Sequence, residues 1–329
     1  PLHSAVSFGS TDIVKKLLEH GADLDAENRE GETAIHFAVN PNTYDALVLA
    51  INEGADVKHR SNWGGHPLHN IAMRGTAYNN LKLFLDKGVD VNVKDNFGRT
   101  PLFLTSWAEN PDEMSKILIM HGAHVNGYCT NEETGVCYPN FSTPLHGAVR
   151  HGKKNLAYNL VANGARVNVL DHEGHTPLQS GIMGGDTEII EYLIKNGAFL
   201  NVHEPAMGST ELHMAAAMGY GDICSILMAS GSCPNATDFN GKTPFDYAMY
   251  YGHNQLAYDM LAQGADDSRL AEHINAPDML AQEVAFGEAQ MWFLGHSGWA
   301  IKTQNHFLVF DYFSNTWDRK ADDSCLASG

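Results

Sequence analysis

One pattern of about thirty-three residues recurs eight times along the chain and constrains the fold more than any other feature. Each copy opens with a short apolar turn, and the eight turns begin at Pro1, Ala34, Pro67, Pro101, Pro144, Pro177, Glu211 and Pro244. A glycine after the second apolar stretch keeps nearly the same step, at Gly21, Gly54, Gly88, Gly122, Gly164, Gly197, Gly231 and Gly264. Two landmarks with matching steps indicate a true internal repeat.

The fifth copy shows how one repeat folds. Thr143-Pro144 predicts a helix start, because threonine caps helices and proline at the first helical position loses no hydrogen bond. Gly152 ends this inner helix, and apolar residues at helical spacing predict an outer helix that ends at Gly164. A polar hairpin follows at 171–174. Neither helix can bury its apolar face alone, so neighbouring repeats must supply the missing wall.

The period and the Thr-Pro-Leu-His turn at 143–146 resemble ankyrin repeats. The resemblance implies an all-α repeat solenoid of about eight helix-turn-helix plus hairpin repeats over residues 1–267. Arrays of this kind usually bind proteins rather than catalyse. The function expected from it is therefore a protein-protein interaction scaffold that binds a protein or peptide partner on its concave face.

Composition narrows the partner classes. The chain has 329 residues, and 21 lysines and arginines against 39 acidic residues give a net charge of −18, which disfavours nucleic acid as a partner. No apolar run is long enough to span a membrane. Five cysteines in this length do not make a disulfide framework, so a reducing, cytoplasmic location is expected.

The chain begins inside a repeat, which suggests a fragment and leaves an upstream signal open. The oligomeric state is also left open.

The recurring histidines are expected to be structural rather than metal ligands. His3, His36, His69, His146 and His213 occupy one position of successive repeats. Equivalent residues of stacked repeats lie about 8–10 Å apart, whereas zinc needs nitrogens about 2 Å from the metal. The run from Asp171 to His175 lies on a hairpin tip, where polar residues are expected in any case. The sequence therefore predicts no metal site and no catalytic residue.

Two sets of positions are predicted to face a partner: the tips of the hairpins and the last residues of the inner helices. These positions carry aromatic, methionine, arginine and histidine side chains, which are enriched at interfaces. The predicted binding residues are Phe8, Trp63, Met73, Arg74, Phe97, Trp107, Arg150, His151, His172, Met183, Met207, Met218, Phe239, Tyr250 and Tyr251. The alternative is that several of these rings pack along the stack or against the insertion.

The fourth repeat is about ten residues too long, and the extra residues lie in an insertion at 126–142. Long loops in compact arrays tend to be functional or mobile. Cys129 and Cys137 could form a disulfide or supply two zinc thiolates. Free thiols are the preferred interpretation, because no second cysteine or histidine pair accompanies them.

The repeat pattern ends after Gly264, and residues 268–287 are expected to form a linker or capping helix. Beyond it, two apolar runs at 291–303 and 306–312 flank a polar turn and predict a short C-terminal β-hairpin. Two strands alone are marginal in water, so this hairpin needs further sheet.

Residues 288–329, with Leu-Gly-His-Ser-Gly at 294–298 and a strand ending at Asp311, resemble the opening strands of metallo-β-lactamase-fold hydrolases. His296 and Asp311 match family positions near the site, but the H-x-H-x-D-H metal motif is not found in the sequence. The resemblance implies an alternative function, the substrate-recruiting half of a metal-dependent hydrolase. Zinc or manganese would belong to the full-length parent, with no cofactor in these residues. A third possibility is that the tail only caps the array.

Overall fold

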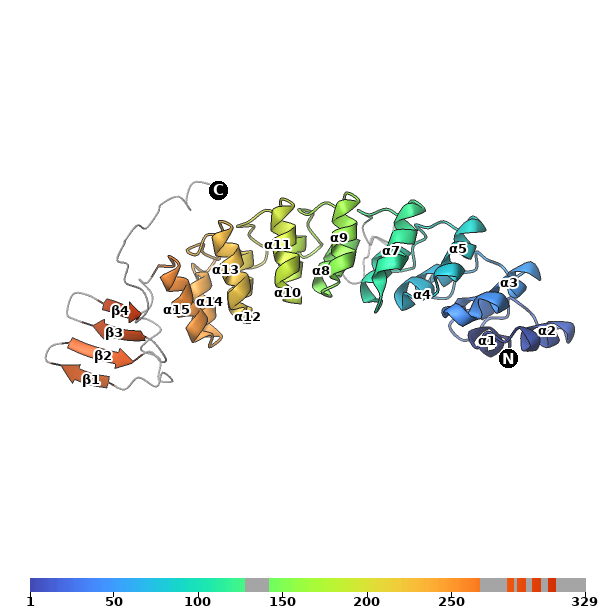
Figure 1. The fold of residues 1–329 in the computed structure, drawn as a ribbon, viewed down its shortest axis with the longest axis horizontal. Coiled ribbons are helices and arrows are strands. Elements are labelled where there is room, and N and C mark those ends of the chain that lie inside the picture. Colours follow the sequence, from blue (N-terminus) through green and yellow to red (C-terminus); the bar gives the residue numbers. More distant parts are fainter. Residues whose placement is uncertain (128–141, 267–282, 287–288, 294–297, 303–306, 312–329) are drawn as a thin grey trace. The chain divides into compact units, whose positions relative to one another are not determined.

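A computed structural model describes residues 1–127 and 142–266, together with the backbone of four strands between 283 and 311 (Figure 1). The chain forms two compact units, Pro1–Ala215 and Ala216–Gly329, and each is considered by itself. The insertion cysteines Cys129 and Cys137 lie outside the described residues.

Each of the eight predicted repeats contributes an inner helical segment followed by an outer helix, which confirms the all-helical repeat solenoid. The inner segments are α1 (Leu2–Ser7), η1 (Ala34–Phe37), α4 (Pro67–Arg74), α6 (Pro101–Leu104) with η3 (Thr105–Trp107), α8 (Pro144–Arg150), α10 (Pro177–Gly184), α12 (Glu211–Met218) and α14 (Pro244–Tyr250). The outer helices are α2 (Thr11–Glu19), α3 (Tyr44–Asn52), α5 (Tyr78–Asp86), α7 (Pro111–Met120), α9 (Lys154–Ala162), α11 (Thr187–Lys195), α13 (Gly221–Ala229) and α15 (Asn254–Ala262).

The inner helices begin where the sequence predicts, because a side chain before the proline caps the first turn. In α10, the Thr176 hydroxyl accepts a hydrogen bond from the backbone N–H of Gln179, and the Gln179 side chain accepts one from the backbone N–H of Thr176. This reciprocal capping box satisfies two helix N–H groups that have no partner within the helix. The left-handed Gly185 ends the same helix at φ +73°.

The core of the first unit follows the repeat. Leu68, Leu102, Leu145 and Leu178 hold the same position of successive inner helices, and each is at most 1% exposed. The helices also approach closely, since a side-chain carbon added at Gly184 would lie 2.5 Å from the carbonyl oxygen of Val149. Burial between repeats, rather than a globular centre, therefore stabilises the array.

The inner segments of the second and fourth repeats are shorter than expected. In the second, η1 ends at Phe37 and a separate turn η2 (Pro41–Thr43) follows. Asn40 precedes a proline and adopts the extended conformation that such residues prefer. In the fourth, α6 gives way to η3 before Ala108 turns extended ahead of Pro111. These interrupted helices leave backbone carbonyls that other groups must satisfy.

The second unit contains α13, α14 and α15 and a four-stranded antiparallel sheet in the order β1-β2-β3-β4. Its strands are β1 (Glu283–Phe286), β2 (Ala289–Phe293), β3 (Gly298–Lys302) and β4 (Phe307–Asp311). The predicted hairpin is present as β3 paired with β4, with Ile301 opposite Leu308.

Residues 283–286 form strand β1, where a helix was expected. The alanine-, glutamine- and glutamate-rich composition favours a helix locally, but Val284 and Phe286 alternate as in a strand, and β2 offers a pairing partner. The rest of the expected linker or capping helix, residues 267–282, lies outside the described residues. A four-stranded antiparallel meander occurs in many folds, so the sheet alone does not identify a metallo-β-lactamase domain.

Candidate functional site

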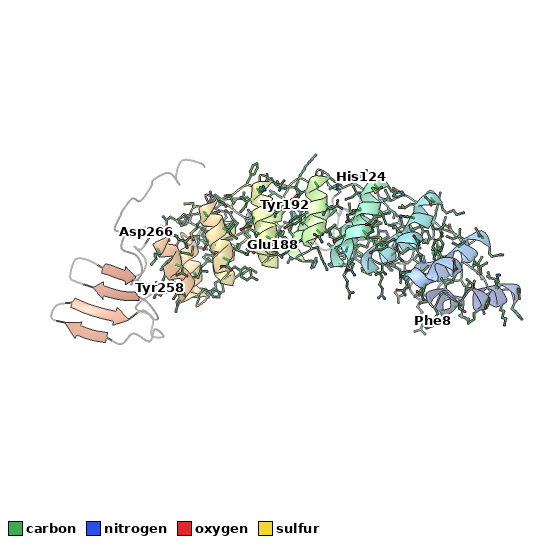
Figure 2. All side chains as sticks on the ribbon, in the orientation of Figure 1. Phe8, His124, Glu188, Tyr192, Tyr258 and Asp266 are labelled. Carbon is green, nitrogen blue, oxygen red and sulfur yellow. The ribbon has the colours of Figure 1, made fainter. Side chains whose placement is uncertain are left out.

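All fifteen predicted binding residues reach solvent. Twelve are exposed: Phe8, Met73, Arg74, Trp107, Arg150, His151, His172, Met207, Met218, Phe239, Tyr250 and Tyr251. Trp63, Phe97 and Met183 are half-buried. Phe8, at the end of α1, is 79% exposed and projects from the helices (Figure 2). The repeat therefore places large apolar and cationic side chains in water at one recurring set of positions.

Three of these side chains form a cluster in the first unit together with Arg99, which was not predicted. The Arg99 guanidinium lies over two rings, 4.6 Å from the centre of Phe97 and 5.5 Å from that of Trp107. Trp107 packs edge-on against Phe103 at 5.5 Å and against His151 at 6.2 Å. We call Phe97, Arg99, Trp107 and His151 the tryptophan cluster. It joins a hairpin, η3 and the end of α8, and cation–π contact holds its rings in place.

Arg99 was missed by sequence reasoning, and the buried Asp95 explains its position. One Asp95 carboxylate oxygen accepts hydrogen bonds from the backbone N–H groups of Phe97 and Arg99, at 2.9 and 2.8 Å. The other accepts from the Arg99 Nε at 2.7 Å. The available signal was a cation four residues after the hairpin aspartate, a position that His175 and Lys242 fill in other repeats.

Trp63 serves the fold more than predicted. Its ring covers Gly65, where an added side-chain carbon would lie 2.2 Å from the indole, and it packs edge-on against His69 at 6.1 Å. The glycine is needed because any side chain at residue 65 would displace the indole. Trp63 is thus partly a packing residue, whereas Trp107 keeps an exposed face.

The second unit carries its own aromatic surface. Tyr250 is 81% exposed and packs edge-on against Tyr251, with ring centres 5.1 Å apart. Tyr247 lies behind Tyr251 and donates its hydroxyl hydrogen bond to the Asp238 carboxylate at 3.0 Å. Phe239, next to that aspartate, is also exposed. The hairpin and the end of α14 therefore both expose aromatic rings.

Four further exposed apolar side chains lie at positions that were not predicted: Ile13, Met120, Leu170 and Phe199. Ile13 lies on the outer helix α2 and Met120 is the last residue of the outer helix α7. Phe199 follows α11, and Leu170 precedes the hairpin aspartate. In the described residues, eight of the twelve exposed large apolar side chains belong to the predicted set.

The recurring histidines are structural, as predicted. The Nδ1 of His36 accepts a hydrogen bond from the Thr33 backbone N–H, and its Nε2 donates to the Gly65 carbonyl of the next repeat at 3.2 Å. His3, His69 and His146 donate to equivalent carbonyls at 2.9, 3.0 and 3.2 Å. Burial lowers the pKa of His36 to about 4. Through these hydrogen bonds the histidine rings link one repeat to the next.

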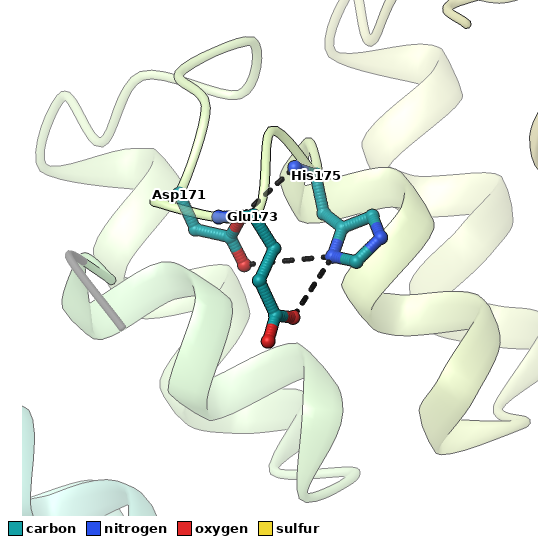
Figure 3. Close-up of side chains that lie close together, drawn as sticks. All are labelled: Asp171, Glu173 and His175. Carbon is teal, nitrogen blue, oxygen red and sulfur yellow. Dashed lines mark hydrogen bonds and ion pairs between the residues drawn. The ribbon is translucent and has the colours of Figure 1, made fainter. Parts of the chain in front are cut away.

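The hairpin that follows the fifth repeat gathers Asp171, Glu173 and His175 (Figure 3). His175 Nδ1 lies 3.4 Å from the Glu173 carboxylate and 3.8 Å from that of Asp171. The Asp171 carboxylate raises the pKa of His175. These three side chains could hold a cation, but Asp171 and His175 occupy the positions of the Asp95–Arg99 pair, and Glu173 takes the position of Phe97. The geometry is that of an ion-paired hairpin, and the predicted His172 points to solvent beside it.

Comparison with known proteins agrees with this architecture. The profile described as ankyrin repeats in three copies matches residues 1–60, 36–129 and 130–204, and that of a single ankyrin repeat matches 207–239. The chain belongs to the ankyrin-repeat family.

Three human proteins are similar in sequence to this ankyrin-repeat chain. Transient receptor potential cation channel subfamily A member 1 is 26% identical over 80% of the chain and 21% of its own length. ARF GTPase-activating protein GIT1 is 34% identical over 41% of the chain and 13% of its own length. Rabankyrin-5 is 28% identical over 54% and 14%. The chain thus spans about a fifth or less of each relative.

No helix among the described residues has the length and apolar character needed to cross a bilayer. Cys224 and Cys233 are buried, and burial raises the pKa of the Cys224 thiol to about 12. Cys224 packs as a small apolar group, since a thiol with so high a pKa is a poor nucleophile.

Proposed function

We propose that the ankyrin array is a scaffold that binds a protein partner through its inner-helix ends and hairpin tips. The observation that carries this proposal is the gathering of exposed apolar side chains at those positions, eight of twelve in the described part of the chain. Burial of such side chains drives association, and aromatic, methionine and arginine residues are the types enriched at interface centres.

The tryptophan cluster is the proposed centre of this surface. Its rings are held by the Asp95–Arg99 pair and by neighbouring rings, so little side-chain freedom is lost on binding. The matching surface of the second unit is formed by Phe239, Tyr250 and Tyr251.

Replacing Met73 and Trp107 by alanine is expected to reduce partner capture at least tenfold, because truncation at an interface centre costs about 2 kcal/mol or more. The matched control is Ile13→Ala with Met120→Ala, which removes similar exposed apolar area from outer helices. Quantitative affinity capture from cell extract, with thermal unfolding of each variant, is the measurement. Equal loss in both pairs would contradict the assignment of the face.

We further propose that residues 288–329 belong to a metallo-β-lactamase-like domain, in which case the array recruits substrate. The support is the antiparallel order of β2, β3 and β4, with a Gly-His-Ser-Gly sequence whose last glycine begins β3. The 329-residue sequence does not contain the H-x-H-x-D-H motif. The 329-residue chain is therefore expected to hydrolyse lactone and phosphodiester substrates no faster with added zinc or manganese than without. Metal-dependent turnover would contradict this expectation.

A reducing, cytoplasmic compartment is proposed for the array. The support is the buried free thiol of Cys224, since cysteines in oxidising compartments are generally paired. Microscopy of a fluorescent fusion tests this directly, and a luminal or secreted signal would contradict it.

A further inference from the structure

Three successive inner-helix ends of the first unit carry an arginine, a tryptophan and a second arginine. Arg74 is the last residue of α4, Trp107 ends η3, and Arg150 ends α8. Helix α4 packs against α6 and η3, and both of these pack against α8. Arg74, Trp107 and Arg150 therefore lie in that order along the stack.

The local charge of this line is opposite to that of the chain. The whole chain carries a net charge of −18, yet Arg74 and Arg150 are exposed here. After burial, the positive charges of Arg150 and Lys153 are what lower the pKa of His151. The exposed Glu109 is the acidic side chain nearest in sequence to Trp107. An acidic ligand would thus be repelled by most of the molecule and attracted here.

The ring between the two arginines is held in position before any ligand binds. Trp107 is 38% exposed, and its covered side is fixed by Phe103, Arg99 and His151. Asp95 neutralises Arg99 through the 2.7 Å ion pair, so Arg74 and Arg150 supply the charge. The line therefore offers an apolar platform with a cation on either side.

The spacing of the arginines selects between ligands. Packed helices lie about 8–10 Å apart, so ends that are two steps apart are separated by about 16–20 Å. A single phosphate group cannot contact both arginines at that separation. An extended peptide advances about 3.3 Å per residue, and five or six residues cover the distance. Carboxylates distributed along a chain fit better than one compact anion.

We propose that the line Arg74–Trp107–Arg150 binds an extended acidic segment of a protein partner. One carboxylate lies on each arginine, and an apolar side chain between them packs on Trp107. This inference rests on the proposed scaffold function and adds the chemistry of the partner.

The test uses the 329-residue chain and fluorescein-labelled synthetic peptides that carry two glutamates with a leucine midway. The peptide with five intervening residues is expected to bind about tenfold more tightly than peptides with about one or about eleven, or one with glutamine for glutamate. Arg74→Gln and Arg150→Gln are each expected to weaken binding about three- to tenfold, and Trp107→Ala at least tenfold. Glu109→Gln is expected to strengthen it. Arg29→Gln removes an exposed arginine of another hairpin and is the matched control.

Three results would overturn the inference. The glutamine peptide could bind as tightly as the glutamate peptide, the affinity could be independent of the spacing, or Arg29→Gln could weaken binding as much as Arg74→Gln. Tighter binding of a single-stranded oligonucleotide than of the glutamate peptide would also overturn it. Circular dichroism melting of each variant separates lost binding from lost folding. If no acidic peptide binds but Trp107→Ala still abolishes partner capture, the scaffold proposal stands and the acidic partner is refuted. If Trp107→Ala changes neither, the proposed face itself is refuted.

Discussion

The array is expected to lose stability steeply as the pH falls from about 6.5 toward 4, because its buried histidines are neutral in the folded chain. Burial lowers the pKa of His36 to about 4 and that of His66 to about 3. The unfolded chain binds protons below pH 6.5, and the folded chain does not until these lower values. Stability is therefore fully present above pH 6.5 and is lost as the pH falls through this window.

The size of the loss follows from the shift. The pKa of His36 is lowered from 6.5 to about 4. At 1.36 kcal/mol per pKa unit, this corresponds to roughly 3 kcal/mol of folding free energy. Burial lowers the pKa of His69 and His146 in the same direction. In each neutral ring, Nδ1 accepts a hydrogen bond from a backbone N–H. Once protonated, Nδ1 would carry a hydrogen that points at this N–H. The hydrogen bond is then replaced by repulsion.

The chain itself supplies the variant that tests this account. Gln179 takes the histidine position in the sixth repeat, accepts from the Thr176 N–H at 2.8 Å and donates to the Val202 carbonyl at 2.9 Å. Glutamine makes both bonds without titrating. His36→Gln with His146→Gln is therefore expected to preserve stability at pH 7 to within about 1 kcal/mol and to lower the pH of half-unfolding.

Circular dichroism during acid titration is the measurement. The control is His124→Gln, an exposed histidine of the first unit, labelled in Figure 2, whose replacement leaves the titration unchanged. An acid midpoint that does not move in the double glutamine variant would show that other groups control acid unfolding.

The second large effect is expected at Asn80, which is fully buried on α5. Its side-chain amide donates to the Ala38 carbonyl at 2.8 Å and to the Thr43 hydroxyl at 2.9 Å. The Ala38 carbonyl is a group that the interrupted inner segment of the second repeat leaves without a helical partner, and the Thr43 hydroxyl in turn donates to the Asn40 carbonyl at 2.6 Å. Asn80→Ala is expected to lower the free energy of unfolding by about 2–4 kcal/mol, since it removes buried volume and leaves buried acceptors unsatisfied.

The neighbouring Asn79 provides the matched control, because it lies on the same helix and is exposed. Asn79→Ala is expected to change the unfolding free energy by less than about 0.5 kcal/mol. Urea unfolding of both variants compares them under one condition. Similar midpoints would mean that water or backbone movement replaces the Asn80 hydrogen bonds.

Local patterns predicted the repeats, because caps, helix period and terminal glycines all act within a few residues. Threonine before proline, as at Thr143-Pro144, predicted the helix starts, and the reciprocal bonds of Thr176 with Gln179 and of Thr33 with His36 were added by the structure. The hydrogen-bonded structural role of the recurring histidines was also predicted from their recurrence, whereas the lowered pKa of His36 follows only from its burial in the structure.

Features that depend on contacts between elements were not predicted. Arg99 reaches Trp107 from another element, and only the folded hairpin fixed by Asp95 places it there. Trp63 fills the space above Gly65, which the sequence does not reveal as a contact. Strand β1 forms because β2 pairs with it, against the helix preference of its surroundings.

Site-specific photocrosslinking tests the central proposal most directly. A photoreactive phenylalanine analogue replaces Trp107 on the proposed face or Met120 at the end of an outer helix, both of which are exposed. In cell extract, the account predicts a discrete crosslinked partner from residue 107, competed by the unmodified chain, and none from residue 120. The same partner crosslinking equally from both residues, or from residue 120 alone, would contradict the assignment of the binding face.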